Sequence, residues 1–171
     1  MSKPKKSTIV VQGTEITVLT REHGDYISIT DMVRDFEGGG ALIEQWLKNK
    51  DTVLFLGVWE QIHNPGFNSL EFEGIRNEAG RNSFFLSAKT WIDRTRAKGL
   101  SASAGRYGGT FAHRDIAFEF GSWLMNAEFI HMGRPQGDRL KRLNQIAIRQ
   151  MQTLTAHAAV RQLGPPKEEK E

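Results

Sequence analysis

The segment Gly105-Arg106-Tyr107-Gly108-Gly109-Thr110-Phe111-Ala112-His113-Arg114-Asp115-Ile116-Ala117 decides the expected fold. Glycine tolerates positive φ, so the glycines of this segment favour a sharp turn that a partner can approach closely. The residues on either side of the turn, Leu100–Ala104 and Thr110–Ala112, are expected to pair as a hairpin. Apolar residues then recur at helical spacing over Arg114–Met125. The pattern predicts a glycine-rich hairpin that runs directly into an amphipathic helix.

Positive charge is concentrated around this hairpin. Residues 76–114 carry eight Lys/Arg and two acids, which gives +6, whereas residues 26–75 carry three Lys/Arg and eight acids, which gives −5. Residues 134–161 are basic again, with six Lys/Arg and one acid, or +5. A basic hairpin beside a helix suits a polyanion, and duplex nucleic acid is the polyanion that we expect.

The composition is that of an ordinary globular protein. A length of 171 residues with 39% hydrophobic and 25% charged residues suits one domain with appended termini. The chain has no cysteine, which excludes disulfides and cysteine metal sites and fits a reducing compartment. No apolar run approaches the ~20 residues of a membrane span, and the N-terminus lacks a secretory signal core. We therefore expect a cytoplasmic protein with no membrane contact.

The residues before the hairpin predict a small sheet followed by helices. β-branched runs separated by turn residues predict three strands, at Ser7–Val11, Glu15–Leu19 and Tyr26–Ile29. Thr30 or Asp31 is expected to cap a helix that ends near residue 36, where Gly38–Gly40 forms a linker.

Apolar spacing predicts the elements between this linker and the hairpin. A helix is expected over residues 41–50, and a second one, capped by Asp51 or Thr52, ends before Pro65. The mixed pattern of residues 68–79 is compatible with another short helix, and Ser83–Leu86 is expected to be a strand. Ser87 then caps a helix over residues 88–97. The four tryptophans fall on the apolar faces of predicted helices and are expected in the core.

These residues resemble a known family. The segment Gly105–Leu124, with Tyr26-Ile27-Ser28-Ile29-Thr30-Asp31 and Trp46-Leu47-Lys48, is similar to the KilA-N domain of phages, bacteria and large DNA viruses. The turn also resembles the wing of the fungal APSES domain, where a G-K-Y-x-G-T-aromatic string precedes a helix. The likeness covers roughly residues 24–130, and Ser28 departs from it, because many KilA-N sequences have asparagine there.

The resemblance implies a DNA-binding domain of the α+β class. Its small antiparallel sheet packs on a helix cluster, in a winged helix-turn-helix-like arrangement with a glycine-rich wing and a C-terminal helix. The expected organisation is a basic tail at residues 1–6, a KilA-N-like domain at 7–130, a helical extension at 131–163 and a disordered tail at 164–171. A phage or prophage origin and a role in transcription regulation are part of this expectation.

The expected function is binding to double-stranded DNA without catalysis, cofactor, metal or small-molecule substrate. Cationic side chains neutralise phosphates, while the predicted 87–98 helix and the 105–110 turn orient the protein in the grooves. The expected DNA-binding residues are Lys89, Arg94, Arg96, Lys98, Ser103, Arg106, Tyr107, Thr110, His113 and Arg114.

Other interpretations of the same residues stay open at this point. The acidic 26–75 segment or the C-terminal helix is a candidate surface for a protein partner, which would make the chain an interaction module. A helix over residues 138–156 with a narrow apolar seam suits a homodimer, or packing on the domain's own core. His113, Asp115 and Glu119 suggest a metal-dependent nuclease, which we rank last because the sequence shows no complete set of metal ligands and the helix dipole also explains Asp115.

Overall fold

The computed structural model describes residues 3–106 and 108–131, together with residues 141, 145 and 148. Contacts divide the chain into two compact units, residues 1–124 and 125–171. Tyr107, the predicted tail at 164–171 and most of the predicted 138–156 helix lie outside the described residues.

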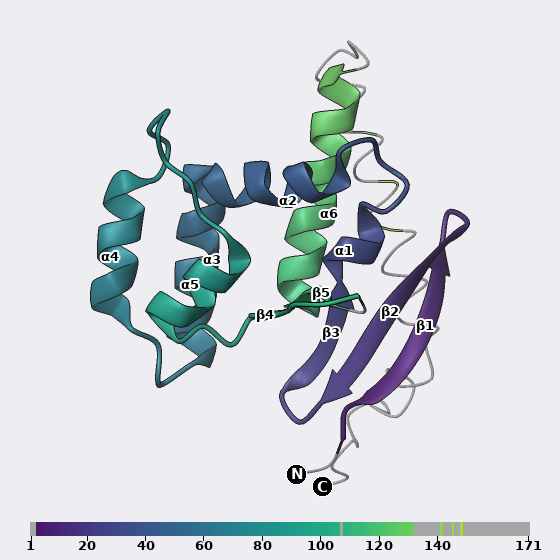
Figure 1. Cartoon of the computed structure of the whole chain (residues 1–171), viewed down its shortest axis with the longest axis horizontal. Coiled ribbons are helices and arrows are strands. Elements are labelled where there is room, and N and C mark those ends of the chain that lie inside the picture. The colour runs from purple at the N-terminus through teal and green to yellow at the C-terminus, as the bar shows by residue number, and fades with distance from the viewer. Residues whose placement is uncertain (1–2, 107, 132–140, 142–144, 146–147, 149–171) are drawn as a thin grey trace, which may run out of the picture. The chain divides into compact units, whose positions relative to one another are not determined.

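One antiparallel sheet runs through the first unit. The N-terminal strands β1 (Lys5–Val11), β2 (Thr14–Arg21) and β3 (Gly24–Ser28) pair in chain order, as the sequence predicts. The hairpin of β4 (Leu100–Ser103) and β5 (Gly109–His113) joins the same sheet, so that the order is β1-β2-β3-β5-β4. Figure 1 shows this hairpin between the strands and the helices. The predicted hairpin is therefore an extension of the N-terminal sheet through the pairing of β3 with β5.

Short polar residues begin most of the helices. The described helices are α1 (Ile29–Met32), α2 (Gly39–Lys48), α3 (Lys50–His63), α4 (Ser69–Glu78), α5 (Ala88–Thr95) and α6 (Arg114–His131). A side-chain oxygen accepts a hydrogen bond from an early backbone N–H at Ser28, Asn49, Asn68 and Ser87. Such caps satisfy N–H groups that have no partner inside the helix. Only the Ser87 cap agrees with the sequence prediction.

Four local predictions are wrong. Ser28, not Thr30 or Asp31, caps α1, which ends at Met32. Two of the three glycines predicted as a linker, at 39 and 40, form the first turn of α2. Asn49 caps α3, two or three residues before the predicted cap at Asp51 or Thr52, because its side-chain oxygen accepts the N–H of Asp51. Residues 83–86 form no strand: Phe84 and Leu86 are buried and Phe85 is exposed, which gives the alternation of a strand without a partner strand.

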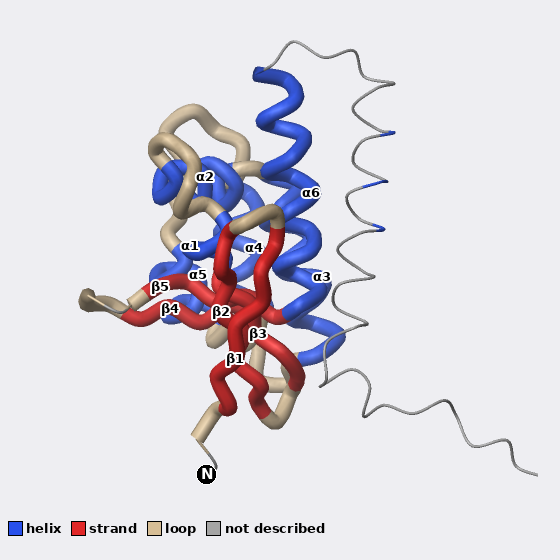
Figure 2. The backbone as a smooth tube through the Cα atoms, turned by 90° about the vertical axis from the view of Figure 1, so that its right-hand side faces the viewer, coloured by secondary structure: helices blue, strands red, loops and turns tan. Residues whose placement is uncertain are grey.

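Strands and helices both contribute to the buried core, and Figure 2 shows the sheet beside the helices. Trp46 of α2, Trp91 of α5 and Phe120 of α6 have no exposed surface, and Trp59 of α3 is also buried. Trp123 is only half-buried, so the prediction that all four tryptophans belong to the core holds fully for three of them. Burying each such side chain contributes on the order of 2–3 kcal/mol to the free energy of folding. These residues therefore contribute strongly to the packing of the helices.

A buried carboxylate fixes the connection from α5 to β4. Glu60 of α3 is only 1% exposed. Its Oε1 accepts the backbone N–H groups of Lys98 (3.0 Å) and Gly99 (2.6 Å). Its Oε2 accepts the Lys98 N–H (3.0 Å) and the side-chain amide of Asn64 (2.8 Å). Three of these four contacts therefore hold the irregular backbone at Lys98 and Gly99 in one conformation, and no sequence pattern predicted them.

His113 fixes the second connection, from β5 to α6. Its ring is 8% exposed and lies against Trp59, at 4.9 Å between ring centroids, and edge-on to Tyr26, at 5.7 Å. Its Nδ1 accepts the backbone N–H of Asp115 at 3.3 Å, as a helix cap does. Burial lowers the pKa of His113 more than the neighbouring Asp115 carboxylate raises it. The neutral ring is therefore the form that the folded chain favours.

Replacing Glu60 by glutamine is expected to destabilise the fold. Every oxygen of the carboxylate faces N–H donors, so the amide group of glutamine must point at a donor in either orientation. We expect a loss of about 1–3 kcal/mol in the free energy of unfolding, measured by urea denaturation. The control Glu44→Gln on the exposed side of α2 should change it by less than about 0.5 kcal/mol. Equal stability of the two variants would show that the Glu60 contacts contribute nothing.

The stability of the fold is expected to fall as the pH is lowered from 7 to 5. An unfolded chain protonates His113 near its ordinary pKa of 6.5, whereas the folded chain resists protonation to a lower pH. In His113→Asn, the asparagine oxygen replaces Nδ1 as the acceptor for Asp115 but takes up no proton in this range. Its free energy of unfolding should therefore change less between these pH values than that of the parent. An identical pH dependence would contradict the assignment.

Candidate nucleic-acid interface

The cations of α5 already face carboxylates. The helix packs Trp91 and Thr95 inward and presents Lys89 and Arg94 outward. Lys89 Nζ lies 2.7 Å from Oδ2 of Asp93, one turn along the same helix. Arg94 Nη2 lies 2.8 Å from Oε2 of Glu71 on α4. These carboxylates offset much of the positive charge that the sequence assigns to this helix.

The residues after α5 carry exposed cations on a rigid backbone. Arg96 has a left-handed backbone, with φ of 56°, and its carbonyl accepts the side-chain amide of Asn64 at 2.9 Å. This conformation is uncommon outside glycine, and α5 ends before it at Thr95, two residues short of the predicted end at residue 97. The carbonyl of Lys98 accepts the hydroxyl of Tyr26 at 2.8 Å, while its N–H is bonded to Glu60. The side chains of Arg96 and Lys98 are exposed, so both are presented from fixed backbone positions.

Close packing requires glycine at position 99. A Cβ atom there would lie 2.9 Å from Glu60 Oε1 and 2.9 Å from the indole of Trp59, and it would overlap the side chain of Ile116. The chain therefore passes through the junction of α3, α5 and α6 at a point where no larger residue fits.

The wing between β4 and β5 is a tight turn. Gly105 has φ of 106°, as predicted for a glycine at this turn, and its carbonyl accepts the N–H of Gly108 at 2.9 Å. A side chain on Gly108 would overlap the carbonyl of Ser103. Arg106 is exposed on this turn, and Ser103 is exposed at the end of β4, just before it. The structure therefore places Arg106 at the tip of the hairpin, as predicted from the sequence.

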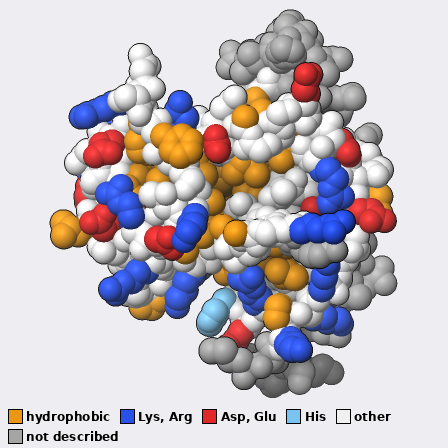
Figure 3. All heavy atoms as spheres, in the orientation of Figure 1, with side chains coloured by type: hydrophobic (Ala, Val, Ile, Leu, Met, Phe, Trp, Pro, Cys, Tyr) orange, Lys and Arg blue, Asp and Glu red, His pale blue; other side chains and the backbone are white. Residues whose placement is uncertain are grey.

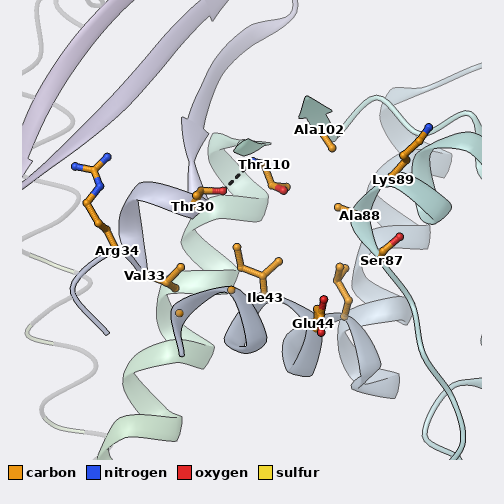
Figure 4. Close-up of a pocket in the computed structure, with 13 residues that line it drawn as sticks. Thr30, Val33, Arg34, Ile43, Glu44, Ser87, Ala88, Lys89, Ala102 and Thr110 are labelled. Carbon is orange, nitrogen blue, oxygen red and sulfur yellow. Dashed lines mark hydrogen bonds between the residues drawn. The ribbon is translucent and has the colours of Figure 1, made fainter. Parts of the chain in front are cut away.

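The base of the wing borders a hollow of about 480 Å³. Thr110 donates its backbone N–H to Oγ1 of Thr30 at 2.8 Å, which ties β5 to α1 (Figure 4). The apolar lining comes from Val33, directly after α1, and from α2, α5 and β4 through Ile43, Leu47, Ala88 and Ala102. Lys89 and Arg34 lie on opposite sides of it in Figure 4, and Figure 3 shows the hydrophobic side chains gathered in the centre of this face. The hollow separates the N-terminus of α5 from the wing.

The sequence-predicted residues do not all reach the surface. Lys89, Arg94, Arg96, Lys98, Ser103, Arg106 and Arg114 are exposed, and Thr110 is half-buried. His113 belongs to the core, where it packs on Tyr26 and Trp59, so its side chain is left out of the candidate interface. Arg114 follows it at the start of α6, with Nε 3.8 Å from Oδ1 of Asp115.

The carboxylates of α6 have structural partners. Asp115 accepts the indole N–H of Trp59 at 3.1 Å, and Glu119 accepts that of Trp46 at 2.7 Å. Burial raises the pKa of Glu119, and the Trp46 hydrogen bond partly opposes this. Within the described residues, no group of three or more His, Asp and Glu side chains is arranged to hold a metal ion. Asp115 and Glu119, which suggested a nuclease in the sequence, thus join α6 to α3 and α2 through hydrogen bonds.

Glu60 is the residue of the site that the sequence analysis missed. The one available signal is the spacing of Glu60 and Asn64, which places a carboxylate and an amide one helical turn apart. Nothing in that spacing identifies the backbone N–H groups of Lys98 and Gly99, 38 and 39 residues after Glu60, as the partners of its carboxylate.

Comparison with known proteins agrees with the resemblance. The model of the KilA-N domain family matches residues 9–131, which is most of the chain. Searches of curated proteins and of solved structures found no match. Among the described helices, none is long and apolar enough to cross a membrane. KilA-N domains are in general DNA-binding domains, which supports a DNA-binding role. The chain belongs to the KilA-N domain family.

Proposed function

We propose that this chain binds duplex DNA through the exposed cations that follow α5 and continue into the wing. One observation carries the proposal: buried Glu60 holds the backbone from which Lys98 projects, and Asn64 holds that of Arg96. Fixed cations lose less conformational freedom on meeting a phosphate than cations on a mobile loop do. Ser103, Arg106, Thr110 and Arg114 complete the proposed interface with Tyr107, which lies outside the described residues.

The two cations of α5 differ from those that follow the helix, because both are already ion-paired. Lys89 and Arg94 must exchange Asp93 and Glu71 for phosphates before they contribute to binding. Each exposed pair contributes at most about 1 kcal/mol, so phosphate contacts of DNA can replace it at low cost. The same carboxylates repel phosphates wherever the exchange is incomplete. We therefore assign the main electrostatic contribution to Arg96 and Lys98, and a smaller one to the two cations of α5.

The order of the elements along the chain suggests how α5 and the wing contact DNA. α4, α5 and the β4–β5 hairpin follow one another as helix, helix and wing. An α-helix fits the major groove, and a basic hairpin fits the adjacent backbone or groove. The connection from α4 to α5 covers residues 79–87, longer than the short turn of a simple helix-turn-helix. In this proposal α5 approaches the major groove and the wing contacts the phosphates beside it.

The interaction-module alternative has less support. Several acids of the 26–75 segment are engaged within the fold: Asp31 accepts the N–H of Thr17 at 2.9 Å, Glu60 is buried, and Glu71 pairs with Arg94. They leave a smaller acidic surface than the sequence suggests. The phage or prophage origin, the regulatory role and the homodimer through residues 138–156 remain predictions, and most of that last segment lies outside the described residues.

Removing the two cations after α5 is expected to weaken binding and its salt dependence together. Two lost phosphate contacts should lower the log–log salt slope by about 1.8, which is about 60-fold in affinity at 0.1 M salt. Fluorescence anisotropy of Arg96→Gln/Lys98→Gln with a labelled random-sequence duplex measures both. Arg76→Gln/Lys50→Gln removes the same charge elsewhere and should keep nearly the parent slope. Equal slopes for the two variants would contradict the proposed interface, and no binding by the parent at low salt would contradict the proposed function.

Removing the carboxylate that holds Arg94 is expected to strengthen binding. Glu71→Gln frees the guanidinium and removes a repelling charge, so affinity should rise about two- to fivefold in the same assay. Glu78→Gln, an exposed position near the end of α4, changes the net charge equally and should have a smaller effect. An equal gain from both variants would mean that only net charge matters and that Arg94 contacts no phosphate.

A further inference from the structure

A second hollow, of about 330 Å³, lies where the β2–β3 turn approaches the start of β4. Its polar lining consists of Arg21, His23, Tyr26, Lys98 and Ser101, and none of its lining residues is acidic. Its remaining lining is apolar and comes from α5, β4 and the residues between them. Basic groups, a hydroxyl and an aromatic ring around one hollow are the surroundings that suit a phosphate group.

Arg21 is held in place for such a contact. Its Nη2 donates to Oγ of Ser101 at 3.2 Å, across the sheet from β2 to β4. Its guanidinium carbon lies 4.5 Å from the centroid of the Tyr26 ring. Arg21 makes no ion pair with any described residue, in contrast to Lys89 and Arg94. A guanidinium that is positioned by a ring and a hydroxyl retains its charge for an anion.

The hollow is continuous with the proposed DNA interface through Lys98. The same Tyr26 that packs under Arg21 donates its hydroxyl to the Lys98 carbonyl at 2.8 Å. The backbone at Lys98 is thereby fixed from two sides, by Glu60 and by Tyr26. A strand of DNA that follows Arg96 and Lys98 would reach the β2–β3 turn next.

We propose that this hollow receives a backbone phosphate of the bound DNA. Arg21 and Lys98 supply the charge, and Ser101 and the exposed imidazole of His23 supply hydrogen bonds. The inference rests on the proposed function and extends the interface to the β2–β3 turn, which lies about 80 residues before the wing in the sequence. A free nucleotide offers the same phosphate chemistry, and the experiment below separates the two sources.

The experiment compares Arg21→Gln with the parent chain in the anisotropy salt series with a random-sequence duplex. Loss of one phosphate contact lowers the slope by about 0.9, which is about eightfold in affinity at 0.1 M salt. Arg21→Lys retains the charge and should retain most of the slope. Arg76→Gln, on α4 and paired with Glu73, removes one charge away from the hollow and should leave the slope unchanged. Thermal unfolding of each variant shows whether the loss of the Ser101 and Tyr26 contacts weakens the fold.

The outcomes are distinct. A reduced slope in Arg21→Gln alone supports the proposal, whereas a weaker affinity with the parent slope assigns Arg21 a purely structural role and overturns it. Equal slopes for Arg21→Gln and Arg76→Gln also overturn it, while leaving the interface at Arg96 and Lys98 intact. Competition of the duplex by millimolar AMP, lost in Arg21→Gln, would assign the hollow to a free nucleotide instead. If the parent binds no duplex at any salt concentration, the proposed function fails and this site fails with it.

Discussion

The arrangement of this domain depends on one carboxylate that has almost no contact with solvent. Glu60 faces the backbone N–H groups of Lys98 and Gly99 and the side-chain amide of Asn64. Burying a charge is costly unless its hydrogen bonds are complete, and here three donors on two oxygens meet that requirement. Because Asn64 also holds the carbonyl of Arg96, a single cluster determines where α5 ends, where β4 begins and where the exposed cations between them lie.

Polar contacts of the same kind attach α6 to the helices around it. The indole N–H groups of Trp46 and Trp59 reach Glu119 and Asp115, one helical turn apart on α6. The rings supply apolar burial, and the hydrogen bonds fix which turn of α6 each helix meets. His113 completes this junction by capping α6 from within the core. The sequence spacing of His113, Asp115 and Glu119 suggests catalysis. In this fold their hydrogen bonds instead cap α6 and join it to α2 and α3.

Much of the fold follows from local patterns, whereas the site depends on distant partners. The strands, the α5 helix with its Ser87 cap and the glycine-rich wing agree with predictions from alternation, capping and turn chemistry. The strand expected at residues 83–86 is wrong because alternating burial arises here from a connection that packs beside helices. The pairing of β3 with β5, the Glu60 cluster and the Arg94–Glu71 ion pair join residues far apart in the chain. No local sequence pattern specifies such contacts. They determine which cationic side chains are exposed and unpaired, and thus able to contact a phosphate.

The central claim is that the connection fixed by Glu60 is the surface that meets DNA. It is tested most directly by titrating the ¹⁵N-labelled full chain with a short duplex of random sequence and following the backbone amide signals. We expect the largest changes on residues 95–103, on the wing and on the β2–β3 turn, smaller ones on α5, and little change on α4 beyond Glu71. Changes confined to the acidic 26–75 segment, with the signals of Lys98 and Gly99 unmoved, would contradict it.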